Sequence, residues 1–270
     1  MPAHRMWPDW GQASSVQPPW PRCAANLWDM RVPRLAGVIE RRVLVNYRVD
    51  PEAAARLLPA PFRPQLVRGH AMAGICLIRL ARVRPAGMCD WVGIRSENAA
   101  HRFAVEWERE GQLHAGVYIP RRDTDSRLNH WAGGTIFPGV HHLADFSVDE
   151  IEDRIAIELV SEDGETRVGV RGRGAEGLPA DSVFESLAEA SAFFEGGSLG
   201  YSETETAHLY HGLELACPAW RCAAMEVEQV HSSYFEDRER FPAGTTAFDH
   251  ALTMHDIEHE WISHDDLRGC

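Results

Sequence analysis

The sequence contains no lysine, so all 27 residues in its combined count of lysine and arginine are arginines. A buried lysine can lose its proton and attack a carbonyl carbon, whereas a guanidinium group stays protonated and is a poor nucleophile. Schiff-base catalysis by a lysine side chain is therefore excluded. Apart from histidine, the positively charged side chains of this protein are therefore permanently charged.

Two adjacent arginines, Arg121 and Arg122, have the types and spacing of an anion site. The forked donors of a guanidinium group can hold a carboxylate or phosphate by two hydrogen bonds, and a fixed charge in a partly desolvated place attracts anions. The alternative is structural: with Asp123, Asp125 and Arg127, the pair could form an ion-paired turn. The sequence leaves both interpretations open.

General acid–base catalysis would need a histidine, tyrosine or carboxylate beside the substrate. We therefore group Tyr118, His101 and His130 with Arg121 and Arg122 as candidate ligand-binding residues. The sequence identifies no catalytic residue. Further acid–base candidates are Glu106, Glu195 and Glu214.

The 14 histidines invite a test for metal ligands. His255 and His259 have the i, i+4 spacing of two ligands on one helix face, but segment 254–266 is acidic throughout and lacks an HExxH motif, so we expect solvated surface. His141 and His142 precede a predicted strand, where alternation would direct one inward and the other outward. We expect neither a metal nor a cofactor.

Charge and missing motifs exclude several classes of function. A net charge of −13 argues against nucleic-acid and anionic-membrane partners and favours a small molecule or a protein. No GxSxG, P-loop or GxGxxG motif is present. The six cysteines have no zinc-site spacing, and we find neither a signal-peptide pattern nor an apolar run near ~18 residues, so we predict a cytoplasmic protein with reduced thiols.

Composition and length favour one large domain. Hydrophobic residues make up 44% of the 270-residue chain and charged residues 25%, which is typical of a globular protein with a sizeable core. We predict a Trp/Pro-rich N-terminal arm over 1–36, a single β-rich domain over 37–262 and a C-terminal tail over 263–270.

Most of the domain has strand patterns. Short β-rich segments span 37–49, 71–83, 101–110 and 113–120, separated by Pro and Gly signals. The alternation on both sides of Asp163-Gly164 predicts a hairpin with a type I′ turn. Two more strands are expected within 213–235, on either side of Pro218.

Three short helices are expected. Asp50 and Pro51 fit an N-cap and first helical residue for a helix near 50–58. Ser182 and Glu185 have capping-box spacing for a helix over 182–195, and a third helix is predicted within 126–132. Many strands without regular βαβ alternation indicate an antiparallel barrel or a folded sheet with helical lids.

Segments 45–80, 116–142 and 197–215 resemble the YqjF-like uncharacterised family of the acetoacetate decarboxylase-like superfamily, and the similarity extends from about 37 to 262. The resemblance implies a mainly β (α+β) fold, an antiparallel barrel or cone around a central cavity with a few short helices, and a possible homo-oligomer. In the decarboxylase, a Pro-Lys-Lys element supplies the Schiff-base lysine. Pro120-Arg121-Arg122 stands at the corresponding place, and the acidic residue before that element has no clear match. Only the fold and the cavity carry over.

The expected function is the binding of a small anionic, carboxylate-bearing ligand in the central cavity. The alternative is a lysine-independent enzyme that acts on a small oxo-acid by acid–base or electrostatic catalysis, with the arginines orienting its acid group. The sequence leaves open whether the protein is an enzyme.

Overall fold

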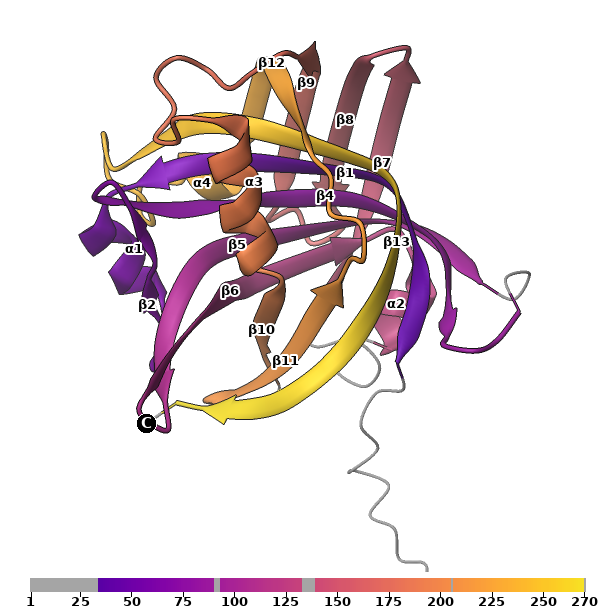
Figure 1. Ribbon diagram of the computed structural model, residues 1–270, viewed down its shortest axis with the longest axis horizontal. Coiled ribbons are helices and arrows are strands. Elements are labelled where there is room, and N and C mark those ends of the chain that lie inside the picture. Colours follow the sequence, from indigo (N-terminus) through magenta and orange to yellow (C-terminus); the bar gives the residue numbers. More distant parts are fainter. Residues whose placement is uncertain (1–33, 90–92, 133–138, 205, 270) are drawn as a thin grey trace, which may run out of the picture. The chain divides into compact units, whose positions relative to one another are not determined.

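The computed structural model describes residues 34–89, 93–132, 139–204 and 206–269. Within them, the strands form one sheet that is mainly antiparallel (Figure 1). The mainly β fold class predicted from the sequence is confirmed. The strands are β1 (Leu35–Val49), β2 (Arg63–Pro64), β3 (Leu66–Val67), β4 (His70–Pro85), β5 (Ile94–Arg109), β6 (Gln112–Thr124), β7 (His141–Ile151), β8 (Arg154–Ser161), β9 (Arg167–Ala175), β10 (Leu199–Glu203), β11 (Leu209–Ala216), β12 (Ala223–Ser232) and β13 (Thr246–Arg268).

The pairings close the sheet into rings. The order β6-β10-β11-β13-β1-β4-β5 returns to β6 because β5 and β6 also pair. A second ring runs from β6 through β7, β8, β9 and β12 to β13 and closes through the same strands β1, β4 and β5. Among the described strands, β6 forms parallel pairs with β7 and β10, and the other pairs are antiparallel.

The shared strands are apolar on both faces because each face covers a hydrophobic cluster. On β1, Val43 and Val45 pack into one cluster, whereas Leu44 between them packs into the other. All three are completely buried. The three consecutive apolar residues 43–45 are the pattern of a strand segment that is covered on both sides.

The helices largely follow the sequence signals. In α1, the Asp50 side chain accepts hydrogen bonds from the N–H groups of Glu52 and Ala53, as an N-cap does. The predicted helix within 126–132 is present as α2. None of the helices in the described residues is long and apolar enough to cross a membrane. The helices are α1 (Pro51–Leu57), α2 (Arg127–Ala132), α3 (Leu187–Gly196) and α4 (Ser233–Glu236).

The predicted start of the 182–195 helix is wrong. The N-cap of α3 is Ser186, whose side chain accepts a hydrogen bond from the Glu189 N–H. Ser182 instead donates to Asp249 Oδ1 at 2.7 Å, and the Val183 N–H donates to Asp249 Oδ2 at 3.0 Å. The Asp249 carboxylate therefore holds this segment in a non-helical conformation.

The hairpin around Asp163-Gly164 is confirmed as β8 and β9, but its turn differs from the prediction. Gly164 has a φ of 76°, whereas Asp163 is not in the left-handed region that a type I′ turn also requires there. The connection spans 162–166, and the Asp163 carboxylate accepts the Glu165 N–H at 3.0 Å. A side-chain hydrogen bond thus shapes this loop.

The structure describes the predicted C-terminal tail but almost none of the predicted N-terminal arm. Residues 1–33 of the predicted arm lie outside the described residues. At the other limit, β13 continues to Arg268 and pairs there with β11, where Leu267 lies opposite Tyr210. Residues 263–268 therefore continue the sheet, and the separate tail predicted for this segment is wrong there.

Candidate functional site

A cavity lies inside the ring formed by β6, β10, β11, β13, β1, β4 and β5, and every strand of this ring contributes to its wall. The cavity has a volume of about 100 Å³. Its lining is largely apolar and includes Ile78, Leu80 and Leu215 of the second hydrophobic cluster. Three arginines interrupt this apolar wall: Arg42, Arg102 and Arg122.

With the described residues, Arg42 on β1 makes weakly polar contacts. Its Nε donates to the Sγ of Cys76 at 3.2 Å, and its Nη1 lies 3.9 Å from the Sδ of Met254. The guanidinium carbon lies 5.4 Å from the centroid of the Trp220 ring. These contacts position the cation without neutralising it.

Arg102, on β5, is 6% exposed. Its Nη2 donates to Asn46 Oδ1 at 2.7 Å, and its guanidinium carbon lies 4.8 Å from the centroid of the Phe194 ring. Its Nε has no hydrogen-bond partner among the described residues. One buried donor of a charged group is thus left unsatisfied, which is costly unless something binds to it.

Arg122, on β6, donates from Nε to Ser202 Oγ at 3.1 Å. Gly139 makes this contact possible: it has a φ of 81°, and a Cβ there would lie 2.7 Å from the Cβ of Ser202. Among the described residues, neither Arg122 nor the other two cavity arginines forms an ion pair with a carboxylate.

Burial lowers the pKa of Arg102 and of Arg122 to about 10. Both side chains therefore remain protonated at neutral pH. Asp123 is a wall residue with a carboxylate, but its Oδ1 accepts a hydrogen bond from Arg121 Nη2 at 2.8 Å. The positive charge of the cavity is consequently not balanced within it.

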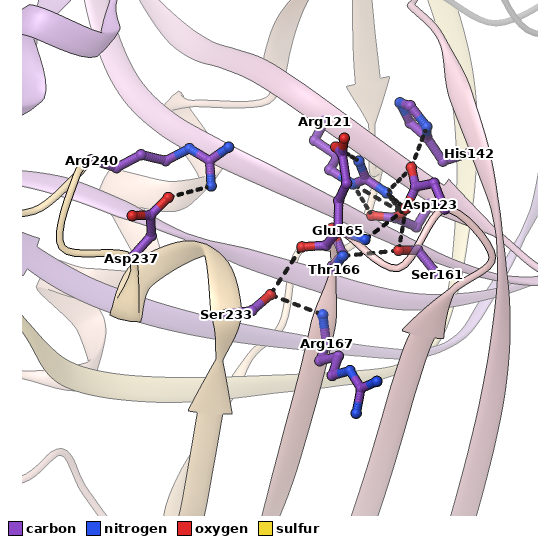
Figure 2. Close-up of polar contacts among 11 residues, drawn as sticks. Arg121, Asp123, His142, Ser161, Glu165, Thr166, Arg167, Ser233, Asp237 and Arg240 are labelled. Carbon is purple, nitrogen blue, oxygen red and sulfur yellow. Dashed lines mark hydrogen bonds and ion pairs between the residues drawn. The ribbon is translucent and has the colours of Figure 1, made fainter.

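Arg121 does not line the cavity and forms an ion-pair cluster instead (Figure 2). Its guanidinium group contacts Asp123, and it also reaches Asp163 Oδ2 at 2.9 Å and Glu165 Oε2 at 3.0 Å in the loop between β8 and β9. His142 Nδ1 lies 3.0 Å from Asp163 Oδ2. The ion-paired interpretation thus holds for Arg121, with partners from another hairpin in place of Asp125.

The other three predicted site residues lie outside the cavity wall. His101 is fully buried, neither of its ring nitrogens has a hydrogen-bond partner among the described residues, and its ring centroid is 4.7 Å from that of Tyr234. Burial lowers its pKa to about 3. Tyr118 packs against Phe62, and burial raises its pKa. His130 is exposed and contacts the His141 carbonyl oxygen through Nδ1.

The three glutamates considered as acid–base groups are also outside the wall. Glu106 accepts from Arg63 Nε at 2.8 Å, and Glu214 lies 2.5 Å from His264 Nε2. Glu195 is exposed. Glu195 and Glu214 line a neighbouring pocket, which shares Ser198 and Leu215 with the cavity wall.

His141 and His142 alternate as predicted: His141 is buried and lines the cavity, whereas His142 points to the ion-pair cluster. Burial lowers the pKa of His141 to about 3. The solvated surface predicted for 254–266 is wrong at His259, which is 2% exposed. Glu40 and Asp256 are both left out of the β1–β13 pairing, and Asp256 has a φ of 52°. The alternation of buried side chains reverses there, since Met254 and Ile257 are both buried. No cluster of three or more potential metal ligands occurs among the described residues.

Sequence reasoning missed Arg42, Arg102 and Cys76. A signal for Arg102 was present, because an arginine between the apolar residues of 101–105 is unusual unless its charge has a use. Arg42 gave no comparable signal. Of the adjacent arginines Arg41 and Arg42, Arg41 is the buried one, and its side chain forms ion pairs with Glu97 and Glu150.

Comparisons with known proteins agree with this architecture. The model of the DUF2071 family, described as an uncharacterized conserved protein, matches residues 38–254. The fold is similar to that of an acetoacetate decarboxylase from Legionella pneumophila, with a TM-score of 0.54, 12% identity and coverage of 95% of this chain and 99% of that one. No curated protein gave a significant match.

Two further solved structures have a similar fold. One is the enduracididine biosynthesis enzyme MppR with HEPES buffer bound, with a TM-score of 0.51, 13% identity and coverage of 88% of this chain and 89% of that one. The other is an acetoacetate decarboxylase-like enzyme from Sphingomonas wittichii, with a TM-score of 0.50, 12% identity and coverage of 88% and 93%. At these identities the likeness shows the fold alone.

Proposed function

Since this chain belongs to the DUF2071 family, whose fold here is acetoacetate decarboxylase-like, we propose that it binds a small organic acid in its central cavity. The guanidinium groups of Arg42, Arg102 and Arg122 hold the acid. We also propose the finer placement in the YqjF-like group, which rests on the sequence resemblance of segments 45–80, 116–142 and 197–215.

One observation carries this proposal: three guanidinium groups that have no carboxylate partner within the described part of the chain lie on the wall of one largely apolar cavity. Arg102 is buried, and Arg42 and Arg122 are half-buried. Cations that are withdrawn from water without a counterion are costly, so they are normally paired. In the same protein, Arg41, Arg79 and Arg121 are each paired with carboxylates. A carboxylate ligand would supply the missing counterion and accept forked hydrogen bonds.

The apolar part of the wall supports a small organic anion in preference to an inorganic one. Ile78, Leu80 and Leu215 offer contacts that a carbon skeleton can use and a phosphate or sulfate cannot. Ligand sites typically combine such an apolar lining with a few fixed polar groups.

Binding is better supported than acid–base catalysis. Of the titratable side chains in the described wall, His141 is kept neutral by burial, and the Asp123 carboxylate is held by Arg121. A general acid or base usually has a pKa near neutral pH, whereas burial lowers that of His141 to about 3. We further propose that the protein acts in the cytoplasm, without nucleic-acid or membrane partners, in keeping with its net charge of −13.

Isothermal titration calorimetry with acetate, pyruvate and succinate tests the proposal. We expect saturable binding of at least one of these carboxylates, and none of acetamide, which has a similar size but no charge. Equal weak heats from the acids and from acetamide, or displacement of the acids by any salt at the same ionic strength, would refute it.

A further inference from the structure

The register of the sheet places Cys76 in line with one cavity arginine. Cys76 on β4 lies opposite Ala100 on β5, and Ala100 lies opposite Arg122 on β6. Adjacent strands are about 4.8 Å apart, so the backbones of Cys76 and Arg122 are separated by roughly 10 Å, with only a methyl group between them on this row. A long arginine side chain can cover much of that distance.

The other two cavity arginines are the diagonal neighbours of Cys76. On the β1 side, Arg42 lies opposite Ile78, two residues along β4 from Cys76. On the β5 side, Arg102 lies opposite Gly74, two residues in the other direction. Diagonal residues on one face are within reach of long side chains, and Arg42 does donate to the Cys76 sulfur at 3.2 Å.

The thiol has access to the cavity although its residue is only 7% exposed, because Cys76 is part of the cavity wall. The arrangement also indicates that a ligand belongs beside it. Arg102 is more than nine-tenths buried, lines the same cavity, and has no partner among the described residues for its Nε. An anion bound to that donor would lie next to the sulfur.

We propose that Cys76 is a nucleophile that adds reversibly to the carbonyl carbon of an oxo acid bound in the cavity, an inference that rests on the proposed function. The carboxylate of the acid binds the arginines. The sulfur forms a bond to the carbonyl carbon, the π electrons of the C=O bond move to oxygen, and the thiol proton ends on that oxygen. The product is a hemithioketal, and no oxidant or reductant is required.

The surroundings favour this addition for three reasons. A thiolate is the reactive form of cysteine, and guanidinium groups stabilise negative charge on sulfur. The same groups stabilise the charge that develops on the carbonyl oxygen. Fixing the carboxylate beside the sulfur also replaces a bimolecular encounter by an intramolecular one. The step needs no lysine, which this chain lacks.

Carbon-13 NMR tests the addition directly, with pyruvate labelled at its carbonyl carbon as the probe. We expect a new resonance of a tetrahedral carbon bonded to sulfur with the wild-type protein and with Cys89→Ser, but none with Cys76→Ser. Calorimetry of the same samples separates the two proposals. Pyruvate binding without the resonance refutes the role of Cys76 and leaves the binding function intact. Absence of both refutes both.

A labelling experiment on the wild-type protein covers the case in which Cys76→Ser fails to fold. Iodoacetate and iodoacetamide alkylate thiols and differ in charge, and peptide mass spectrometry reports each cysteine separately. The exposed Cys89 is the internal reference. We expect the iodoacetate-to-iodoacetamide rate ratio at Cys76 to exceed that at Cys89 by about tenfold or more, because the arginines concentrate anions. Equal ratios, or an unreactive Cys76, would overturn the proposal.

Discussion

Arg121 and Arg122 are neighbours on β6, but their guanidinium groups have different environments. Arg121 forms ion pairs with carboxylates of β6 and of the β8–β9 loop, whereas Arg122 lines the cavity and contacts a serine. The ion-paired interpretation of this pair therefore describes Arg121, and the ligand-binding interpretation stays a proposal for Arg122. The roles can be separated by substituting them individually.

Replacing Arg122 with alanine should weaken carboxylate binding by about 1.5–3 kcal/mol, which is roughly a tenfold to hundredfold rise in Kd, because one charge-assisted contact is lost. Arg63→Ala is the matched control, since Arg63 is an exposed arginine that pairs with Glu106. Calorimetry with pyruvate measures both. Unchanged affinity in Arg122→Ala would contradict the role of this residue.

Replacing Arg121 with methionine should reduce the free energy of unfolding by about 3–5 kcal/mol, because the completely buried Asp123 would lose its partner. Burial already raises the pKa of Asp123 against the opposing effect of Arg121. Adding Asp123→Asn to this variant should restore part of the loss. Urea denaturation measures the series, and a variant as stable as the wild type would show that the cluster contributes little.

Acidification should destabilise the protein between about pH 6.5 and pH 4. Burial lowers the pKa of His101 and His141 to about 3 and that of His259 to about 4. As the pH falls below 6.5, these imidazoles become protonated in the unfolded chain but stay neutral in the folded protein. Each of them therefore lowers the free energy of unfolding by about 1.4 kcal/mol per pH unit. The stability contributed by the neutral histidines is fully present above pH 6.5 and is lost as the pH falls toward their folded-state pKa values.

Urea denaturation at a series of pH values tests this dependence. His101→Phe should flatten the slope, because it removes one of the three buried imidazoles. The matched control is His255→Gln, which changes an exposed histidine and should keep the wild-type slope. Identical slopes in all three proteins would show that His101 is not neutral in the folded state.

Borohydride treatment in the presence of acetoacetate or pyruvate should trap no imine on any side chain. The reason is covalent chemistry: no lysine is available to form one. Intact-mass and peptide mass spectrometry would detect the adduct. A reduced adduct mapped to the interior of the chain would overturn this expectation.

The sequence predicted the elements better than the site because elements depend on local patterns. Asp50 and Pro51 mark the start of α1 through contacts within a few residues. Arg42 and Arg102, by contrast, are more than 50 positions apart in the chain and are brought together only by the register of β1, β4 and β5. No local pattern encodes that register. The reversed alternation at Asp256, after which His259 is buried, is equally invisible in a periodicity analysis.

The pairing of β1 with β13 has a consequence for how the protein is made. Val49 lies opposite Thr246 and Leu35 opposite Trp261, so the first described strand gains this neighbour only after synthesis has passed residue 246. Contacts this distant in sequence slow folding, and an unpaired apolar strand is prone to aggregate while it waits. During synthesis, the edge of β1 stays open until β13 has left the ribosome, so the yield of native protein should depend on chaperones that shield this strand.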